Sequence, residues 1–166
     1  MLALTSILLA WAALTSSCSS SPANVAGSYT VNLTDDQNGC MFDNWTGTTM
    51  GVPLELTQNG TAVTATVGGL AGAYFDGVFG SHVMVGSVSG SHVDVVIHGT
   101  RQTTPPGTSC MVSLDADATV DLSGDSFQNG IIHYSYVTNH DTTCPIYTQS
   151  CTSTQLFNGS RPPTTH

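Results

Sequence analysis

The chain has 166 residues, of which only 8% are charged, and its two basic side chains are outnumbered by eleven acidic ones. Its net charge of −9 leaves no cationic surface for nucleic acid or anionic lipid, so both kinds of electrostatic partner are excluded. Hydroxyl, amide and glycine residues take the place of charges. This composition is typical of a β-rich exported domain rather than of a disordered acidic tail.

The N-terminal residues have the pattern of a secretory signal. An apolar run from Leu2 to Leu14 is shorter than the roughly 20 residues that cross a bilayer, and small residues follow it up to Cys18. This segment resembles the signal of bacterial lipoproteins, in which a small residue precedes a lipid-modified cysteine. The resemblance implies lipid attachment at Cys18. No Lys or Arg precedes the apolar run, which departs from the usual pattern.

This boundary divides the chain into four parts. We expect a signal over residues 1–18, a Ser/Pro linker over 19–25, a single domain over 26–161 and a short tail over 162–166. The sequence therefore predicts an exported protein, either anchored in the cell envelope through its lipid or secreted. In these respects the chain resembles the small envelope lipoproteins of bacteria.

Apolar and polar side chains alternate along most of the domain, which predicts strands with one buried face and one solvated face. Asn59-Gly60 marks a tight turn between two of these runs, because both residues tolerate positive φ. The predicted strands cover residues 27–33, 52–56, 63–67, 82–88, 93–97, 112–122, 127–138 and 150–157.

One segment has a helical period instead. Leu70, Tyr74, Phe75, Val78 and Phe79 recur at helical spacing, which predicts a short helix near residues 70–79. Eight strands then remain, and an even number allows the first and the last to pair antiparallel. The sequence predicts an all-β fold, an eight-stranded antiparallel up-and-down barrel with one short helix.

Four cysteines follow the signal, and their even number predicts two disulfides in an exported domain. In the barrel topology all four lie at one rim. Pairing across adjacent strands would join Cys110 to Cys144 and Cys40 to Cys151. Pairing by sequence proximity would join Cys144 to Cys151 and Cys40 to Cys110, and we slightly favour this second arrangement. A zinc site is disfavoured because no close Cys-x-x-Cys pair occurs.

The two ends of the domain carry the residues of a known pattern. Gly27-Ser-Tyr29 opens the first strand, and Arg161 follows the last. In these features the chain resembles the calycin group, lipocalins and their relatives, in which a Gly-x-Trp opens the first strand and an Arg packs on its aromatic ring. The resemblance implies a structural pair of Tyr29 and Arg161 in a cation–π contact, with Tyr in place of Trp.

No constellation of residues predicts catalysis or a bound cofactor. His92 and His98 share a strand face with Asp94, but that face points to solvent. Residues six apart on a strand also lie about 20 Å from each other, so we expect no metal site. The turn aspartates lack the spacing of a calcium loop, and no nucleophile, phosphate or dinucleotide motif occurs. The sequence predicts a protein that is not an enzyme and binds no cofactor.

Aromatic side chains mark the expected ligand pocket. Small inward residues at Ala65, Ala116 and Ala118 would leave room for one apolar ligand, and the 70–79 helix would close one end of the barrel as a lid. The alternative is that the rings fill the core, because the interior of an eight-stranded barrel is just wide enough for side chains. The candidate pocket residues are Tyr29, Tyr74, Phe75, Phe79, Tyr134 and Tyr136.

Other functions compete with ligand binding. The loop over residues 35–51 carries Met41, Phe42 and Trp45, which we expect to be exposed and to contact a protein partner, as in a protease inhibitor. A purely structural envelope lipoprotein is a further alternative. An outer-membrane barrel is disfavoured, because its strands need about 9–11 residues with aromatic girdles and most of the predicted strands are shorter.

Overall fold

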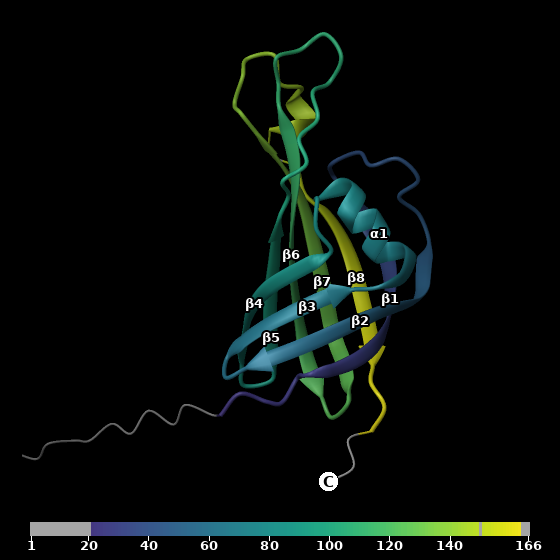
Figure 1. The fold of residues 1–166 in the computed structure, drawn as a ribbon. Helices are drawn as coiled ribbons and strands as arrows, with labels where there is room; N and C mark the ends of the chain where they lie inside the picture. The colour runs from purple at the N-terminus through teal and green to yellow at the C-terminus, as the bar shows by residue number, and fades with distance from the viewer. Residues whose placement is uncertain (1–20, 150, 164–166) are drawn as a thin grey trace, which may run out of the picture.

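Eight antiparallel strands and one α-helix form a closed up-and-down barrel in the computed structural model, which describes residues 21–149 and 151–163 (Figure 1). The expected signal and Cys18 lie outside the described residues. None of the described helices is both long and apolar enough to cross a membrane. The elements are β1 (Gly27–Asn38), β2 (Thr48–Asn59), β3 (Ala62–Val67), α1 (Gly69–Val78), β4 (Val83–Ser89), β5 (His92–His98), β6 (Val112–Ser123), β7 (Ser126–Thr138), the short 3-10 helix η1 (Ile146–Thr148) and β8 (Ser153–Ser160).

Each strand pairs with its neighbours in sequence, and β8 pairs with β1 to close the barrel. In this closing seam Thr30 lies opposite Ser160 and Asn38 lies opposite Ser153. The predicted eight-stranded barrel with one helix is therefore confirmed. Each strand has a partner on both sides, which satisfies backbone groups that an open sheet would expose at its edges.

Three tight turns lie at one end of the barrel. The connections β2–β3, β4–β5 and β6–β7 each have two residues, and a glycine with positive φ occupies the first position. Glycine reaches this conformation without the steric cost of a Cβ atom. We call this the hairpin end; residues 21–26 and 161–163 lie there too (Figure 1). The three glycines are Gly60, Gly90 and Gly124, with φ of 62°, 60° and 62°.

The opposite end of the barrel carries the longer connections. Helix α1 joins β3 to β4 there, and extended loops join β1 to β2, β5 to β6 and β7 to β8 (Figure 1). We call this the loop end. The loop end is therefore formed by long connections and α1, whereas the hairpin end is formed by short turns.

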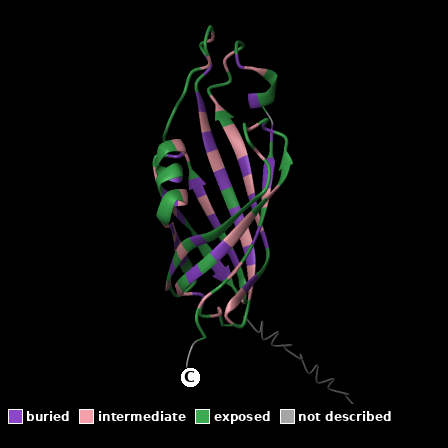
Figure 2. Ribbon diagram, turned by 90° about the vertical axis from the view of Figure 1, so that its right-hand side faces the viewer, coloured by how far each residue is buried: buried purple, intermediate pink, exposed green. Residues whose placement is uncertain are grey.

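Apolar side chains alternate into the barrel along the strands, as the banding of buried residues in Figure 2 shows. On β6, Val112, Leu114, Ala116, Ala118 and Val120 are buried, and the residues between them face outward. The period of two that is visible in the sequence thus corresponds to one inward and one outward face. The inward faces of all eight strands form one hydrophobic core.

The first two strands are longer than the alternation predicted. β1 continues to Asn38 and β2 begins at Thr48, so the expected loop over residues 35–51 shrinks to residues 39–47. The polar run after Leu33 suggests a loop, but Asp35 stays in register with Gln155 of β8 and accepts a hydrogen bond from its side-chain amide. A hydrogen bond between polar side chains thus accompanies the extension of β1 beyond the last apolar residue of its alternating run.

Helix α1 buries a different face from the one expected. Phe75 and Phe79 are buried, whereas Leu70 is 91% exposed and Tyr74 is 67% exposed. Leu70 and Tyr74 lie one turn apart on one side, and Phe75 and Phe79 lie one turn apart on the next. The predicted stripe therefore spans two faces, and only one of them packs on the barrel.

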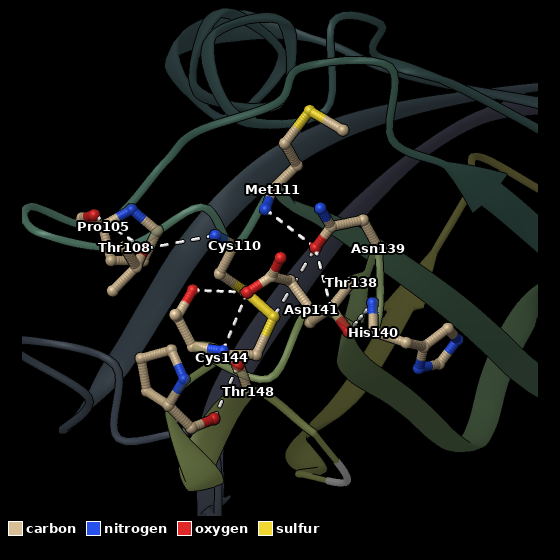
Figure 3. The surroundings of a disulfide bond; sticks show 12 residues. Pro105, Thr108, Cys110, Met111, Thr138, Asn139, His140, Asp141, Cys144 and Thr148 are labelled. Atoms are coloured by element: carbon tan, nitrogen blue, oxygen red, sulfur yellow. Dashed lines mark hydrogen bonds between the residues drawn. A yellow bond between two sulfur atoms is a disulfide. The ribbon is translucent and has the colours of Figure 1, made fainter.

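Both disulfides lie at the loop end, but the pairing favoured from sequence proximity is wrong. Cys40 is bonded to Cys151, with a Cα–Cα distance of 4.8 Å. Cys110 is bonded to Cys144 at the same Cα–Cα distance (Figure 3). Cys110 precedes β6 and Cys144 follows β7, and these two strands are neighbours; the same holds for Cys40 after β1 and Cys151 before β8. The pairing expected from strand adjacency is therefore the one found, and η1 lies between Cys144 and Cys151 in the chain.

Arg161 closes the hairpin end, where its side chain is only 7% exposed. It donates hydrogen bonds to the Asp125 carboxylate at 2.9 Å and to two backbone carbonyls just before β1. Its guanidinium carbon lies 5.4 Å from the centroid of the Tyr29 ring, which stacks on Phe127. The structure thus contains the Tyr29–Arg161 contact that the calycin resemblance implies.

Removing the Cys40–Cys151 disulfide is expected to destabilise the domain more than removing Cys110–Cys144. The two bonds close segments of 111 and 34 residues, and the loop-entropy relation gives about 5 and about 4 kcal/mol respectively. Urea denaturation of the two double Cys→Ala variants measures the difference in the free energy of unfolding. Equal losses, or a larger loss without Cys110–Cys144, would contradict the entropic explanation.

Candidate functional site

The barrel interior contains an apolar cavity. Its volume is about 60 Å³, and all eight strands and α1 contribute to a lining of apolar residues alone. The volume exceeds the roughly 10–15 Å³ that one water needs, but such a lining offers water no hydrogen bond. The lining residues are Val31, Leu33, Val52, Leu54, Leu56, Ala65, Val67, Phe75, Met84, Val93, Val95, Ala118, Val120, Phe127, Ile132 and Phe157.

Small inward residues determine where this space lies. Ala65 and Ala118 line the cavity. Ala116 is also buried, but it lies one inward position nearer the loop end, opposite the buried Tyr134, and it does not line the cavity. A small side chain creates free volume only where no large neighbour enters that volume.

Aromatic rings cover the cavity toward the loop end. Phe75 of α1 lines the cavity, and its ring centroid lies 4.9 Å from that of Phe79, which lies 6.4 Å from that of Tyr134. From the β1–β2 connection, Phe42 and Trp45 pack on Tyr134 with centroid distances of 6.2 and 5.6 Å. Helix α1 and this connection thus lie on the loop-end side of the cavity.

The β1–β2 connection differs from its expected exposure. Met41 is 71% exposed, as expected, but Phe42 and Trp45 are partly buried and pack against the core. The Asn38 side chain causes this turn, because it donates a hydrogen bond to the Phe42 carbonyl and accepts one from the Phe42 amide, both at 2.8 Å. Two of the three candidate partner residues thus belong to the cover of the barrel.

A chain of hydrogen bonds borders the cavity on the loop side. The Tyr134 hydroxyl donates to the Gln155 side chain at 2.7 Å, and the Gln155 amide donates to the Asp35 carboxylate at 2.5 Å. Burial raises the pKa of Tyr134, and Tyr74 and Asp35 raise it further, so the phenol stays protonated. Among the described residues, Nε1 of Trp45 is buried without a hydrogen-bond partner. None of these polar side chains lines the cavity itself; they lie beyond its lining, toward the loop end.

The other candidate pocket residues lie outside the cavity lining. Tyr29 packs at the hairpin end, Tyr74 is exposed on α1, and Tyr136 is half-buried at the loop end. Of the six candidates, Phe75 alone is among the lining residues. Sequence reasoning missed the aliphatic lining, which includes Met84. Alternation identifies such inward residues, but it does not reveal between which of them space remains.

The histidines of β5 lie on the outer surface next to aspartates. Nδ1 of His92 is 2.8 Å from Asp121, and Nδ1 of His98 is 2.6 Å from Asp115, in both cases across the β5–β6 pair. Within residues 21–149 and 151–163, no three His, Cys, Asp or Glu side chains are grouped closely enough to bind a metal ion. The two pairs are cross-strand contacts of the outer sheet surface.

A second cleft, of about 330 Å³, opens in the β7–β8 connection. Its carboxylate, Asp141, accepts hydrogen bonds from the Thr143 hydroxyl and amide at 2.6 and 2.8 Å, and these bonds lower the pKa of Asp141. Figure 3 shows Asp141 beside the Cys110–Cys144 disulfide. The carboxylate thus stabilises the loop in which it lies.

Comparison with known proteins adds a likeness of fold but no family. Neither a protein-family model nor a curated protein matches the chain. Among solved structures, that of EF1p2_mFAP2b bound to DFHBI is similar over 82% of this chain and 93% of its own, with a TM-score of 0.44 and 13% sequence identity. A likeness at this level carries no conclusion about ligand or activity.

Asp121 is expected to keep the pKa of His92 above its ordinary value. The hydrogen bond to Asp121 is the largest cause of the rise, and Asp94 adds to it. Because the folded pKa is raised, this contact stabilises the fold below about pH 6.5, and its contribution fades as the pH rises through the raised value. An NMR titration of His92 should give a lower pKa in Asp121→Asn, whereas Asp117→Asn serves as the control. An unchanged His92 pKa in Asp121→Asn would contradict the assignment.

Proposed function

We propose that the protein is an exported, lipid-anchored cell-envelope protein whose barrel binds a small apolar molecule without catalysing a reaction. The observation that supports this proposal is the cavity in the barrel interior, lined by apolar residues from every strand and from α1. Apolar ligand surface removed from water in such a site contributes about 25 cal/mol per Å². The aromatic cover would keep solvent away from the bound molecule.

The cavity volume limits the ligand. At about 60 Å³ it is smaller than the roughly 150 Å³ of an apolar cavity that admits benzene, and far smaller than drug-sized pockets. A ligand of benzene size or more therefore requires Phe75 or Met84 to move. Met84 is suited to this because its unbranched side chain changes rotamer readily. Phe75 would move with α1, which packs on β2 and β3.

The polar chain beside the cavity would orient the ligand. A molecule with one polar group would place that group toward Tyr134, Gln155 and Asp35, where donors and acceptors already meet. Its apolar part would remain among the aliphatic side chains. Entry beneath α1 would leave the strand pairing of the barrel intact.

The expected lipid would attach near the hairpin end. Cys18 lies five residues before Ala23, whose amide donates a hydrogen bond to the Gly90 carbonyl in a hairpin turn. Val25 is fully buried, so the chain is already packed against the barrel at that point. An anchored protein would therefore direct its loop end away from the membrane.

Filling the cavity is expected to abolish ligand binding without unfolding the barrel. Ala118→Val adds two methyl groups at the cavity lining, and cavity filling commonly adds about 0.5–2 kcal/mol of stability. The matched control, Ala116→Val, adds the same groups opposite Tyr134, where overpacking costs about 1–3 kcal/mol. Benzene and short alkyl alcohols at a hundredfold excess over Kd should stabilise the wild type by about 2.7 kcal/mol.

Thermal unfolding with and without these probes measures both effects. The Tm of the wild type and of Ala116→Val should rise with the probe, by about 5–10 °C, and the Tm of Ala118→Val should not. A wild type that no probe stabilises, or an undiminished rise in Ala118→Val, would refute binding in the cavity.

Lipid attachment is expected at Cys18. Mass spectrometry of the N-terminal peptide, from protein extracted out of bacterial membranes with detergent, should show a mature chain that begins at Cys18 with an acyl mass attached. Cys18→Ala should lack this mass, whereas Cys110→Ala should keep it. An unmodified N-terminus at another residue of the wild type would disprove the anchor and leave the cavity proposal untouched.

A further inference from the structure

Four side chains from four segments meet beyond the cavity lining, on its loop-end side. The Tyr134 hydroxyl of β7 donates a hydrogen bond to Gln155 of β8, whose amide donates one to Asp35 of β1. Trp45 of the β1–β2 connection packs edge-on against the Tyr134 ring, at a centroid distance of 5.6 Å and an interplanar angle of 85°. The Asp35 amide donates to the Gly47 carbonyl at 3.1 Å, which keeps the backbone near Trp45 beside β1. We call Asp35, Trp45, Tyr134 and Gln155 the polar layer.

Alternation along β1 and β8 sets the distance between the polar layer and the cavity. Leu33 and Phe157 lie opposite each other and line the cavity. Asp35 and Gln155 also lie opposite each other, two residues further toward the loop end on the same face. Two residues of a strand span about 7 Å. A molecule whose apolar part lies in the cavity would therefore reach the polar layer with a group at most about 7 Å further along the strands.

The polar layer contains a hydrogen-bond donor that has no acceptor. Of all side-chain nitrogen and oxygen atoms in the described residues, Nε1 of Trp45 alone is buried without a hydrogen-bond partner. The indole is held in this place, because the Phe42 ring packs on it at 5.2 Å and the Asn38 side chain hydrogen-bonds the Phe42 backbone twice. A buried donor without an acceptor destabilises the fold, and a phenyl ring would fill the site without that cost.

The polar layer also carries a negative charge. Asp35 is its one carboxylate, and among the described contacts only Oδ1 of its side chain accepts a hydrogen bond, from Gln155. No described hydrogen bond or ion pair joins Asp35 to an Arg or His side chain, and Arg161 lies at the opposite end of the barrel. A carboxylate or phosphate on a bound molecule would therefore lie near a like charge, which lowers affinity. A neutral oxygen avoids this repulsion and can still accept a hydrogen bond from Trp45.

We propose that Nε1 of Trp45 donates a hydrogen bond to a neutral oxygen, a hydroxyl or carbonyl group, of the molecule that the barrel binds. This inference rests on the proposed binding of an apolar molecule in the cavity, and it names the class of that molecule. The ligand is an uncharged alcohol or carbonyl compound whose apolar part lies in the cavity, and Asp35 disfavours the corresponding acids. Trp45 thus determines specificity in addition to covering the barrel.

NMR of the full chain, labelled with nitrogen-15 and with its disulfides formed, tests the hydrogen bond directly. The chain has two indole N–H groups, at Trp11 and Trp45, and the resonance that is missing from Trp45→Phe belongs to Trp45. Saturating hexan-1-ol or hexan-2-one should move the Trp45 indole proton downfield, as entry into a hydrogen bond does. Hexane should not. The methyl resonance of Met84, which lines the cavity, should move with all three probes.

Titration of the Met84 methyl resonance gives the affinity of each probe in each variant. Trp45→Phe keeps an aromatic ring and loses the donor, so affinity for hexan-1-ol should fall about tenfold, and affinity for hexane should stay within about twofold. The matched control, Tyr147→Phe, removes an exposed hydroxyl at the loop end and should change neither affinity. Asp35→Asn keeps an acceptor for Gln155 without the charge, so the preference for hexan-1-ol over hexanoate should shrink about threefold or more.

The two resonances separate this inference from the proposed function. If the probes move the Met84 methyl but hexan-1-ol leaves the Trp45 indole in place, the cavity binds ligands and the role of Trp45 is wrong. Equal losses of hexane and hexan-1-ol affinity in Trp45→Phe would have the same meaning. Tighter binding of hexanoate than of hexan-1-ol would overturn the neutral class of ligand. If no probe moves the Met84 methyl, the proposed function and this inference are both overturned.

Discussion

Pairing of β1 with β8 is the contact on which the rest of the structure depends, because it turns a meander of strands into a barrel. Three side-chain contacts fasten this seam: the Cys40–Cys151 bond at the loop end, the Asp35–Gln155 hydrogen bond inside, and Arg161 on the Ala26 carbonyl at the hairpin end. They join residues 111, 120 and 135 positions apart. Contacts this distant in sequence are the most expensive in chain entropy, so strong bonds at the seam have the largest effect.

Closure of the seam divides the protein into an apolar interior and one end that carries the long connections. Inside, the inward faces of the strands leave an apolar cavity, to which the small side chains of Ala65 and Ala118 contribute space. Outside, the long connections collect at one end, where Leu70 and Ile146 are highly exposed. The rings of Phe75, Phe42 and Trp45 lie between the two.

The sequence predicts the barrel well because alternation and an even strand number constrain topology. The sequence predicts less well which side chains are buried and which are exposed. Phe42 turns inward because it makes two hydrogen bonds with the Asn38 side chain, and a hydrophobic pattern contains no sign of such bonds. Leu70 is exposed because the apolar stripe of α1 is wider than the face of the helix that packs on the barrel. The cysteine pairing follows strand order rather than separation along the chain. The cavity depends on how Ala118 and Tyr134 fill adjacent layers, which only the three-dimensional register shows.

The scarcity of basic side chains has a consequence for how the protein withstands proteases. Trypsin-like proteases cut after Lys or Arg, and this chain has no Lys, while Arg161 is buried and followed by Pro162. Arg101, exposed between β5 and β6, is then the single place where such an enzyme can act. A cut there would leave two pieces still linked covalently through Cys40 and Cys151, so the nicked barrel would stay together.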